Sequence, residues 1–183
     1  VLFRSLFLLM IPLLAGLVSC DENENDNTDI LTSTTGETTY TVTYEVGSLG
    51  LLDANITEFD NLLFYDLTVS YKNADGTMTE NVVVDSYPWS VTLNDVKAPF
   101  EAQISVNATL KEKEAIVTDK TTFNITGLNN VNISYTSSNN DTHSNKTTSS
   151  IKGLNLDDAY RYLTSSVEKY NGKVVTLAVP YQQ

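Results

Sequence analysis

The chain has 183 residues, and its 23 acidic and 11 basic side chains give a formal net charge of −12 at pH 7. Nucleic-acid binding and electrostatic docking on anionic lipid headgroups are disfavoured, because phosphate groups repel a surface of this sign. One histidine and one cysteine are too few for a zinc site or a disulfide framework. We therefore expect no metal, no cofactor and no nucleic-acid partner.

The first twenty residues have the pattern of an export leader. Arg4 provides a positive charge, an apolar run covers residues 6–17, and residues 17–20 read Leu-Val-Ser-Cys. A charged start, an apolar middle and small residues before the cut are typical of a signal peptide. The tetrapeptide ending in Cys20 resembles the lipobox of bacterial lipoproteins. This resemblance implies a signal peptide over residues 1–19, cleavage before Cys20, diacylglycerol on its sulfur and attachment to a membrane through that lipid.

Two alternatives to a lipid anchor stay open. A plain secreted protein would carry a similar leader, and a signal anchor would keep it as a membrane span. The apolar run is short for a span, which needs about 20 residues. Acylation of Cys20 would use the only thiol of the chain, so the mature domain would have no disulfide and its stability would come from a hydrophobic core.

The acidic run over residues 21–29 contains no apolar side chain and cannot offset the entropy cost of folding. We expect residues 20–37 to be the acylated cysteine and a disordered tether. Acidic residues directly after the lipidated cysteine resemble the signal that sends some Gram-negative lipoproteins to the outer face of the outer membrane. The resemblance implies the outer membrane or cell surface, while the periplasmic face and a simple solvated spacer stay open.

Apolar and polar residues alternate along most of residues 38–135, which predicts half-buried β-strands. The Asp75-Gly76 pair between two such runs predicts a hairpin. Pro88 has no backbone donor, so we expect the chain to reach a sheet edge or to change sheets there. The expected strands cover residues 38–46, 63–71, 78–85, 90–93, 100–110 and 131–135, together with a broken strand over 116–118 and 121–126. Between them we expect a long loop over residues 47–61 and turns at 94–95, Pro99 and 127–130.

The pattern changes after these strands. Residues 137–150 are almost entirely polar and predict a mobile loop. Apolar residues then recur at steps of three and four, which predicts an amphipathic helix over residues 155–171 capped by Asn155. A last strand is expected over residues 173–179, either completing the sheet or pairing elsewhere. The sequence thus predicts one mainly β domain over residues 38–183, an immunoglobulin-like antiparallel β-sandwich of about seven strands with one C-terminal helix.

We expect no catalytic residue and no enzymatic activity. His143 lies in the predicted polar loop, and no nucleophile-elbow motif surrounds any serine. Asp157 and Asp158 fall at the expected start of the helix, where acidic residues complement the helix dipole. Asp66 lies on the polar side of a strand and could pair with Lys72 or another acid.

Trp89 is the aromatic residue with the best case for a ligand contact. It follows Tyr87 and Pro88 at the expected break between strands, where a Trp can form a platform on which sugar rings stack. The competing interpretation is that Trp89 plugs the end of the core. We name Trp89 and Tyr87 as candidate ligand-binding residues.

The sequence therefore favours a non-enzymatic binding or accessory module at the bacterial cell envelope, anchored through Cys20. Its ligand or partner is expected to be a glycan or another envelope protein. A structural or adhesion subunit of the pilus type is the alternative, in which a strand is donated between chains. A hydrolase is the third candidate.

Overall fold

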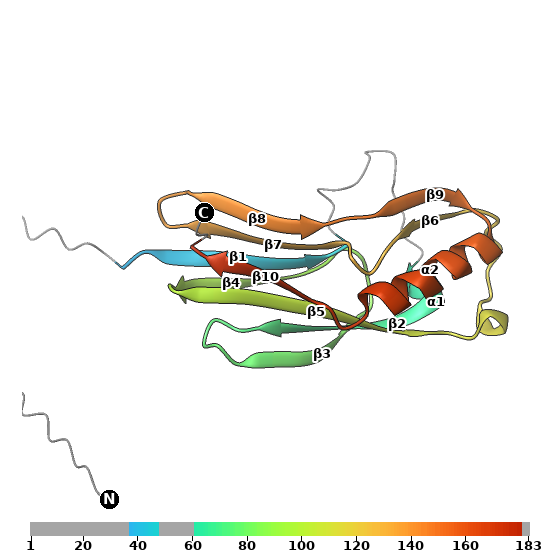
Figure 1. The fold of residues 1–183 in the computed structure, drawn as a ribbon, viewed down its shortest axis with the longest axis horizontal. Coiled ribbons are helices and arrows are strands. Elements are labelled where there is room, and N and C mark those ends of the chain that lie inside the picture. Colours follow the sequence, from blue (N-terminus) through green and yellow to red (C-terminus); the bar gives the residue numbers. More distant parts are fainter. Residues whose placement is uncertain (1–36, 48–60, 181–183) are drawn as a thin grey trace, which may run out of the picture. The chain divides into compact units, whose positions relative to one another are not determined.

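Ten strands and two α-helices form within residues 37–47 and 61–180, which are the residues that the computed structural model describes (Figure 1). All of them belong to the unit that runs from Gly36 to Gln183. The predicted leader, Cys20, nearly all of the tether and most of the loop expected over residues 47–61 lie outside the described residues.

The first five strands are β1 Thr39–Val46, β2 Tyr65–Lys72, β3 Met78–Val84, β4 Trp89–Lys97 and β5 Phe100–Leu110. The other five are β6 Phe123–Thr126, β7 Val131–Ser137, β8 Thr142–Thr147, β9 Ser150–Leu154 and β10 Val174–Val179. The helices are α1 Asn61–Phe64 and α2 Leu156–Tyr170, and a short 3-10 helix spans Lys113–Ala115.

Two four-stranded antiparallel sheets face each other. Sheet A has the order β4-β1-β7-β8 and sheet B the order β10-β5-β2-β3, while β6 and β9 pair as a separate ribbon. The predicted fold class is therefore confirmed: a mainly β, antiparallel sandwich with one helix near the C-terminus and a last strand after it. The neighbours β7-β1-β4 and β2-β5-β10 match the strand order of immunoglobulin-like sheets, although β7, which comes late in the chain, lies beside β1 where those domains place their first strand.

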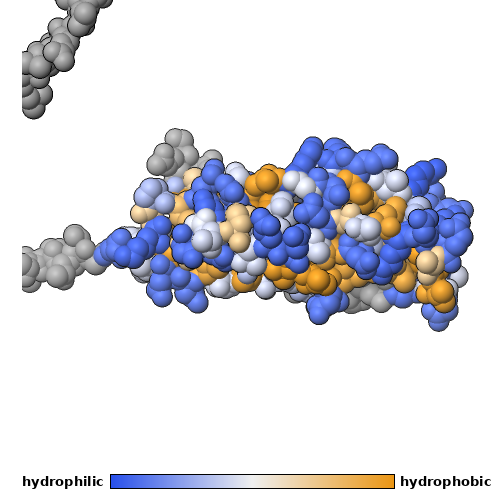
Figure 2. All heavy atoms as spheres, turned by 90° about the horizontal axis from the view of Figure 1, so that it is seen from below, coloured by the Kyte–Doolittle hydropathy of each residue, from blue (hydrophilic) through white to orange (hydrophobic). Residues whose placement is uncertain are grey.

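The core lies between the sheets because alternate residues of each strand point inward. In β1 every second residue is buried, and β5 shows the same alternation over most of its length. Each fully buried Val, Leu, Ile or Phe side chain contributes about 1.5 to 3 kcal/mol of transfer free energy. Figure 2 shows one outer face, where hydrophilic side chains predominate and hydrophobic ones appear between them.

The chain changes sheets at Pro88, as predicted. β3 belongs to sheet B and β4 to sheet A, and the Tyr87-Pro88 peptide bond between them is cis. The Asp75-Gly76 hairpin is also confirmed, since β2 and β3 pair antiparallel on either side of it.

Helix α2 begins where the sequence indicates. The Asn155 side chain accepts a hydrogen bond from the Asp158 backbone N–H, and Asp157 and Asp158 lie in the first turn. Its buried face, which includes Ala159 and Leu163, packs against β5, β6 and β9. The last strand, β10, pairs with β5 and so extends sheet B of the same chain.

The loop predicted over residues 137–150 is wrong. Residues 142–147 form β8, which pairs with β7 from Val131↔Thr147 to Thr136↔Thr142. β8 is an edge strand whose side chains are almost all exposed, so it needs no apolar alternation. Its backbone hydrogen bonds to β7 place it in the sheet, and a polar composition does not reveal such bonds.

Three local expectations also change. The turn expected at 94–95 is a bulge inside β4, where Asp95 has φ 55° and the register with β1 shifts. Leu63 and Phe64 belong to the helical turn α1, and the strand starts only at Tyr65. Residues 116–118 form no strand, although Ile116 is buried in the core.

Two asparagine side chains replace missing strand neighbours. The Asn61 amide donates to the Thr126 carbonyl and accepts from the Thr126 N–H, so it pairs with that residue as a peptide group would. The Asn171 amide does the same to Ala108, with 2.7 Å from the Ala108 N–H to Asn171 Oδ1. Asn61 thereby attaches α1 to β6, and Asn171 continues the β10–β5 ladder beyond Val174.

Candidate functional site

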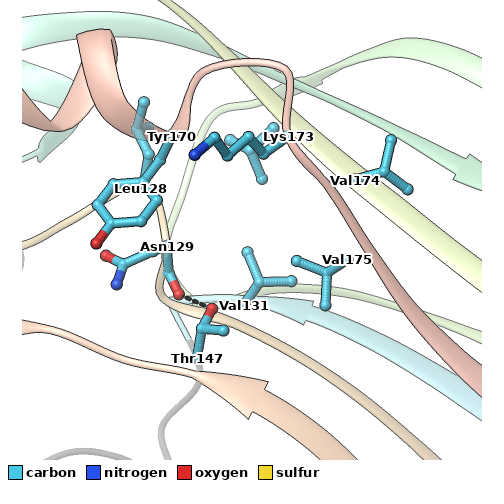
Figure 3. Close-up of a pocket in the computed structure, with 9 residues that line it drawn as sticks. Leu128, Asn129, Val131, Thr147, Tyr170, Lys173, Val174 and Val175 are labelled. Carbon is cyan, nitrogen blue, oxygen red and sulfur yellow. Dashed lines mark hydrogen bonds between the residues drawn. The ribbon is translucent and has the colours of Figure 1, made fainter.

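A pocket of about 300 Å³ opens on the side of the sandwich where the edge strands β8 and β10 meet (Figure 3). We call this side the open seam and the cavity the seam pocket. β10 contacts both β7 and β8 across it. The pocket is lined by Val106, Leu128, Asn129, Val131, Thr147, Tyr170, Lys173, Val174 and Val175.

Buried apolar residues form the floor of the seam pocket. Val106 is 3% exposed, Leu128 3% and Val131 2%. They reach one place from separate elements because the turn between β6 and β7 brings Leu128 and Val131 against β5. Since apolar atoms surround the space, it favours an apolar ligand body.

The rim is formed by the junction between α2 and β10. The Gly172 N–H donates to the Val106 carbonyl and the Lys173 N–H to the Tyr170 carbonyl, so the connecting turn is fixed against β5. Tyr170 and Lys173 therefore stand on one side of the opening, with Val174, which is 60% exposed, at its edge (Figure 3).

Two ammonium groups lie close to the same aromatic ring at this rim. The Lys169 Nζ atom is 4.9 Å from the centroid of the Tyr170 ring, and the Lys173 Nζ atom is 5.9 Å from it. Hydrogen bonding to the Tyr170 side chain raises the pKa of Lys169 above its ordinary value. Both lysines are exposed.

The opposite side of the rim is formed by polar side chains that are hydrogen-bonded to one another. The Thr147 hydroxyl donates to the Asn129 carbonyl, and the Ser149 hydroxyl lies 2.8 Å from Asn129 Oδ1 and 2.8 Å from the Tyr162 hydroxyl. These bonds hold Asn129 in place, with its amide beside the opening (Figure 3).

A second hollow lies farther along the open seam, between residues 143–145 of β8 and 176–178 of β10. One hydrogen bond crosses the seam there, 2.8 Å from Asn145 Nδ2 to the Thr176 carbonyl. This hollow carries Glu101 in its lining, and a hollow on the outer face of sheet B carries Asp66 and Asp85. The seam pocket has a lysine and no acidic residue in its lining.

The two residues named from the sequence lie on the other side of the sandwich, where β3 leads to β4. Trp89 is half-buried, and its ring lies 5.9 Å from that of Tyr71, centroid to centroid. Tyr87 packs over Gly47 so closely that a Cβ at Gly47 would lie 2.3 Å from Tyr87 Cδ1. Both rings thus serve packing, and sugar stacking on the exposed part of Trp89 stays a prediction.

Buried hydroxyls cluster beside this packing. Asn61 Nδ2 donates to the Tyr65 hydroxyl at 3.0 Å, and burial raises the pKa of Tyr65 and of Tyr87 well above the ordinary value. Burial also raises the pKa of Tyr44 to about 12. These groups stay neutral at physiological pH and hold the core together.

Of the acidic residues and the histidine considered from the sequence, Asp157 and Asp158 lie together at the start of α2, Asp66 lies in β2 and His143 in β8. Asp157 pairs with Lys113 at 2.5 Å, and Asp158 pairs with Arg161 at 2.6 Å. Asp66 lies 3.5 Å from Lys111. His143 is in β8, with its ring 6.2 Å from that of Tyr135. Among the described residues, no group of three His, Cys, Asp or Glu is placed to hold a metal ion.

Sequence reasoning missed the seam pocket. One side of its rim comes from residues 169–173, Lys-Tyr-Asn-Gly-Lys, which the sequence places at the end of a helix and the start of a strand. The available signal was an aromatic residue between two lysines in an acidic chain. The floor residues looked like ordinary core, and only the fold brings Leu128 and Val131 to this rim.

Within residues 37–47 and 61–180, no helix is both long enough and apolar enough to span a bilayer. Comparison with models of protein families, with curated proteins and with solved structures finds no match to this chain.

Proposed function

We propose that this protein is a non-enzymatic binding module of the bacterial cell envelope, anchored through lipid on Cys20, which binds a small ligand in the seam pocket. The observation that carries the binding role is a cavity of about 300 Å³ with a buried apolar floor and a polar rim. Ligand sites typically combine these features at about this size or larger. A glycan or an envelope protein remains a candidate partner for the rest of the surface.

The anchoring part of the proposal is supported by the leader and the lipobox-like residues 17–20. β1 begins at Thr39, directly after the residues expected to form the tether. A lipid at Cys20 would thus be joined to β1 through residues 21–38, which begin with the acidic run. Two or three acyl chains hold a protein on a membrane essentially irreversibly.

The anchor is tested by expressing the full chain in a Gram-negative host with and without globomycin and determining the mass of the amino-terminal peptide. We expect an acylated Cys20, accumulation of the uncleaved chain with globomycin, and loss of the acyl mass in Cys20→Ala. A mature protein with an unmodified Cys20 thiol would contradict the anchor.

The pocket is tested with the mature chain, residues 20–183, carrying Cys20→Ala so that no lipid competes. Titration with n-octanol should give saturable methyl NMR shifts at Val106, Leu128 and Val131. The methyl groups of Val83 and Val91, on the far side of the sandwich, are internal controls. Val175→Phe should fill the cavity and abolish the shifts, and Val174→Trp at the exposed rim serves if Val175→Phe unfolds. Absence of a saturable shift would contradict the binding role.

A structural or adhesion subunit is the second candidate, because β10 is an edge strand. The hydrogen bond from Asn145 to the Thr176 carbonyl joins β10 to β8 of sheet A. Strand exchange between chains would require β10 to leave β5. Light scattering on the mature chain should show oligomers that grow with concentration if strands are exchanged, whereas a monomer at all concentrations would eliminate this candidate.

A further inference from the structure

We propose that the seam pocket selects small amphipathic carboxylates, with the apolar tail on Val106, Leu128 and Val131 and the carboxylate at Lys173 and Lys169. This inference rests on the proposed binding function and adds the chemical class of the ligand. It follows from the charge of the rim, the apolar character of the floor and the size of the cavity.

The charge of the rim is opposite to that of the chain. Acidic residues outnumber basic ones 23 to 11, yet none of the residues that line the pocket is acidic. Lys173 lines the opening, and Lys169 stands on the other side of Tyr170 in sequence, with its Nζ atom 4.9 Å from the same ring. An anion at this rim gains two nearby positive charges, while most of the remaining surface repels it.

The C-terminus of α2 opposes this effect only in part. The exposed carbonyls of a helix end act as about half a negative charge, and basic residues often serve merely to balance it. Here two of these carbonyls have backbone partners, because the Asn171 N–H donates to Val167 and the Lys173 N–H to Tyr170. The two lysines carry two full positive charges, against this fraction of a negative charge and the exposed Glu168 of the same helix turn, so the balance at the rim is still positive.

The size of the cavity limits the tail. A cavity of about 150 Å³ lined by apolar side chains takes up benzene. The seam pocket has about twice that volume, which corresponds to roughly ten to twelve non-hydrogen atoms. A straight-chain carboxylate of about eight carbons fits this range. The Lys173 ammonium extends over the opening toward Tyr170, where the head of such a ligand would emerge (Figure 3).

The test compares octanoate with n-octanol, which have tails of the same length and differ in charge. Both are titrated into the mature chain with Cys20→Ala at low ionic strength, and Kd is obtained from the methyl shifts of Val106, Leu128 and Val131. We expect octanoate to bind more tightly, with an advantage that shrinks as salt is added.

Lysine variants at the rim distinguish the contribution of charge to octanoate binding from the contribution of the shape of the pocket. Lys173→Gln should weaken octanoate binding about two- to five-fold, and Lys169→Gln with Lys173→Gln about four- to twenty-fold, the range expected for exposed charge pairs. Octanol binding should stay within about 1.5-fold, because no charge is involved. Lys97→Gln is the matched control. Lys97 is an exposed lysine at the end of β4 that pairs with Glu37, and its removal should change the binding of neither ligand.

The outcomes distinguish the two proposals. Equal affinity for octanoate and octanol, or octanoate binding that is unchanged in the double lysine variant, would overturn the carboxylate preference and leave the binding function standing. Failure of both ligands to give a saturable shift would overturn both proposals.

Discussion

The two lateral seams of the sandwich are closed in different ways. On the side of β3 and β4, the rings of Tyr44, Tyr71 and Trp89 follow one another at centroid distances of 5.6 and 5.9 Å. Tyr87 covers Gly47 beside them. We call this side the closed seam. On the open seam, the hydrogen bond from Asn145 to Thr176 crosses between β8 and β10, and two hollows lie along it.

This difference separates packing from binding. Aromatic residues are the usual basis for predicting a ligand platform, but at the closed seam they fill the space between the sheets. At the open seam the floor is formed by Val and Leu side chains, and the same two-layer geometry leaves a cavity there. A binding site therefore forms where side chains leave the space between the sheets unfilled. Variants at the closed seam should change mainly stability, and variants at the open seam should change it least.

The largest effect is expected for Asn61→Ala next to the closed seam. The variant leaves the Thr126 N–H and carbonyl without their partner at a position that is 1% exposed, and it removes a donor from Tyr65. We expect a loss of about 3 to 5 kcal/mol in the free energy of unfolding, measured by chemical denaturation. A loss below about 1 kcal/mol would show that water takes over the role of the amide.

Gly47→Ala should rank second. Gly47 has φ 69°, and the added Cβ would lie 2.3 Å from the Tyr87 ring. Backbone strain and overpacking together should cost about 2 to 4 kcal/mol in a thermal or denaturant melt. Gly153→Ala is the matched control, because Gly153 has the same φ of 69° with no atom within 4 Å of the added Cβ, so it reports the strain alone. Equal losses in the two variants would contradict the tight contact.

Alkaline pH should weaken the closed side through its buried phenols. Burial raises the pKa of Tyr44 from 10.0 in the unfolded chain to about 12 in the native state. Its contribution is fully present below pH 10 and is lost as the pH rises toward 12, because the unfolded chain then releases a proton that the native state retains. By pH 12 this loss is about 2 kcal/mol for Tyr44 alone. Denaturation across this range should show a shallower fall for Tyr44→Phe than for the unmodified chain, and identical slopes would contradict this effect.

Asn145→Ala on the open seam should have the smallest effect. Its hydrogen bond to Thr176 is exposed, so water can replace it, and the expected loss is about 0.5 to 1 kcal/mol. The variant is the counterpart of Asn61→Ala, with the same substitution and a carbonyl partner in both. Methyl shifts in β10 should show whether the strand loosens without leaving β5. A loss near that of Asn61→Ala would remove the distinction between the seams.

Much of the fold could be predicted because its signals are local. Eleven residues of β5 alternate in the sequence as they do in the sheet, and the helix signals around Asn155 act within one turn. The seam pocket could not be predicted, because its lining comes from β5, the β6–β7 turn, β7, β8 and the α2–β10 junction. Even β8 escaped prediction, since an exposed edge strand has no buried face to impose a period.

The sequence by itself determined the class of the domain, its strand periodicity, the helix and its cap, and the expectation of a lipid at Cys20, because each depends on residues close together in the chain. The tertiary structure decided which seam is filled and which is hollow. It also decided that Asn61 and Asn171 act as strand neighbours. Those outcomes depend on which backbone groups from distant parts of the chain come into contact. Composition and the local spacing of residues do not specify those contacts.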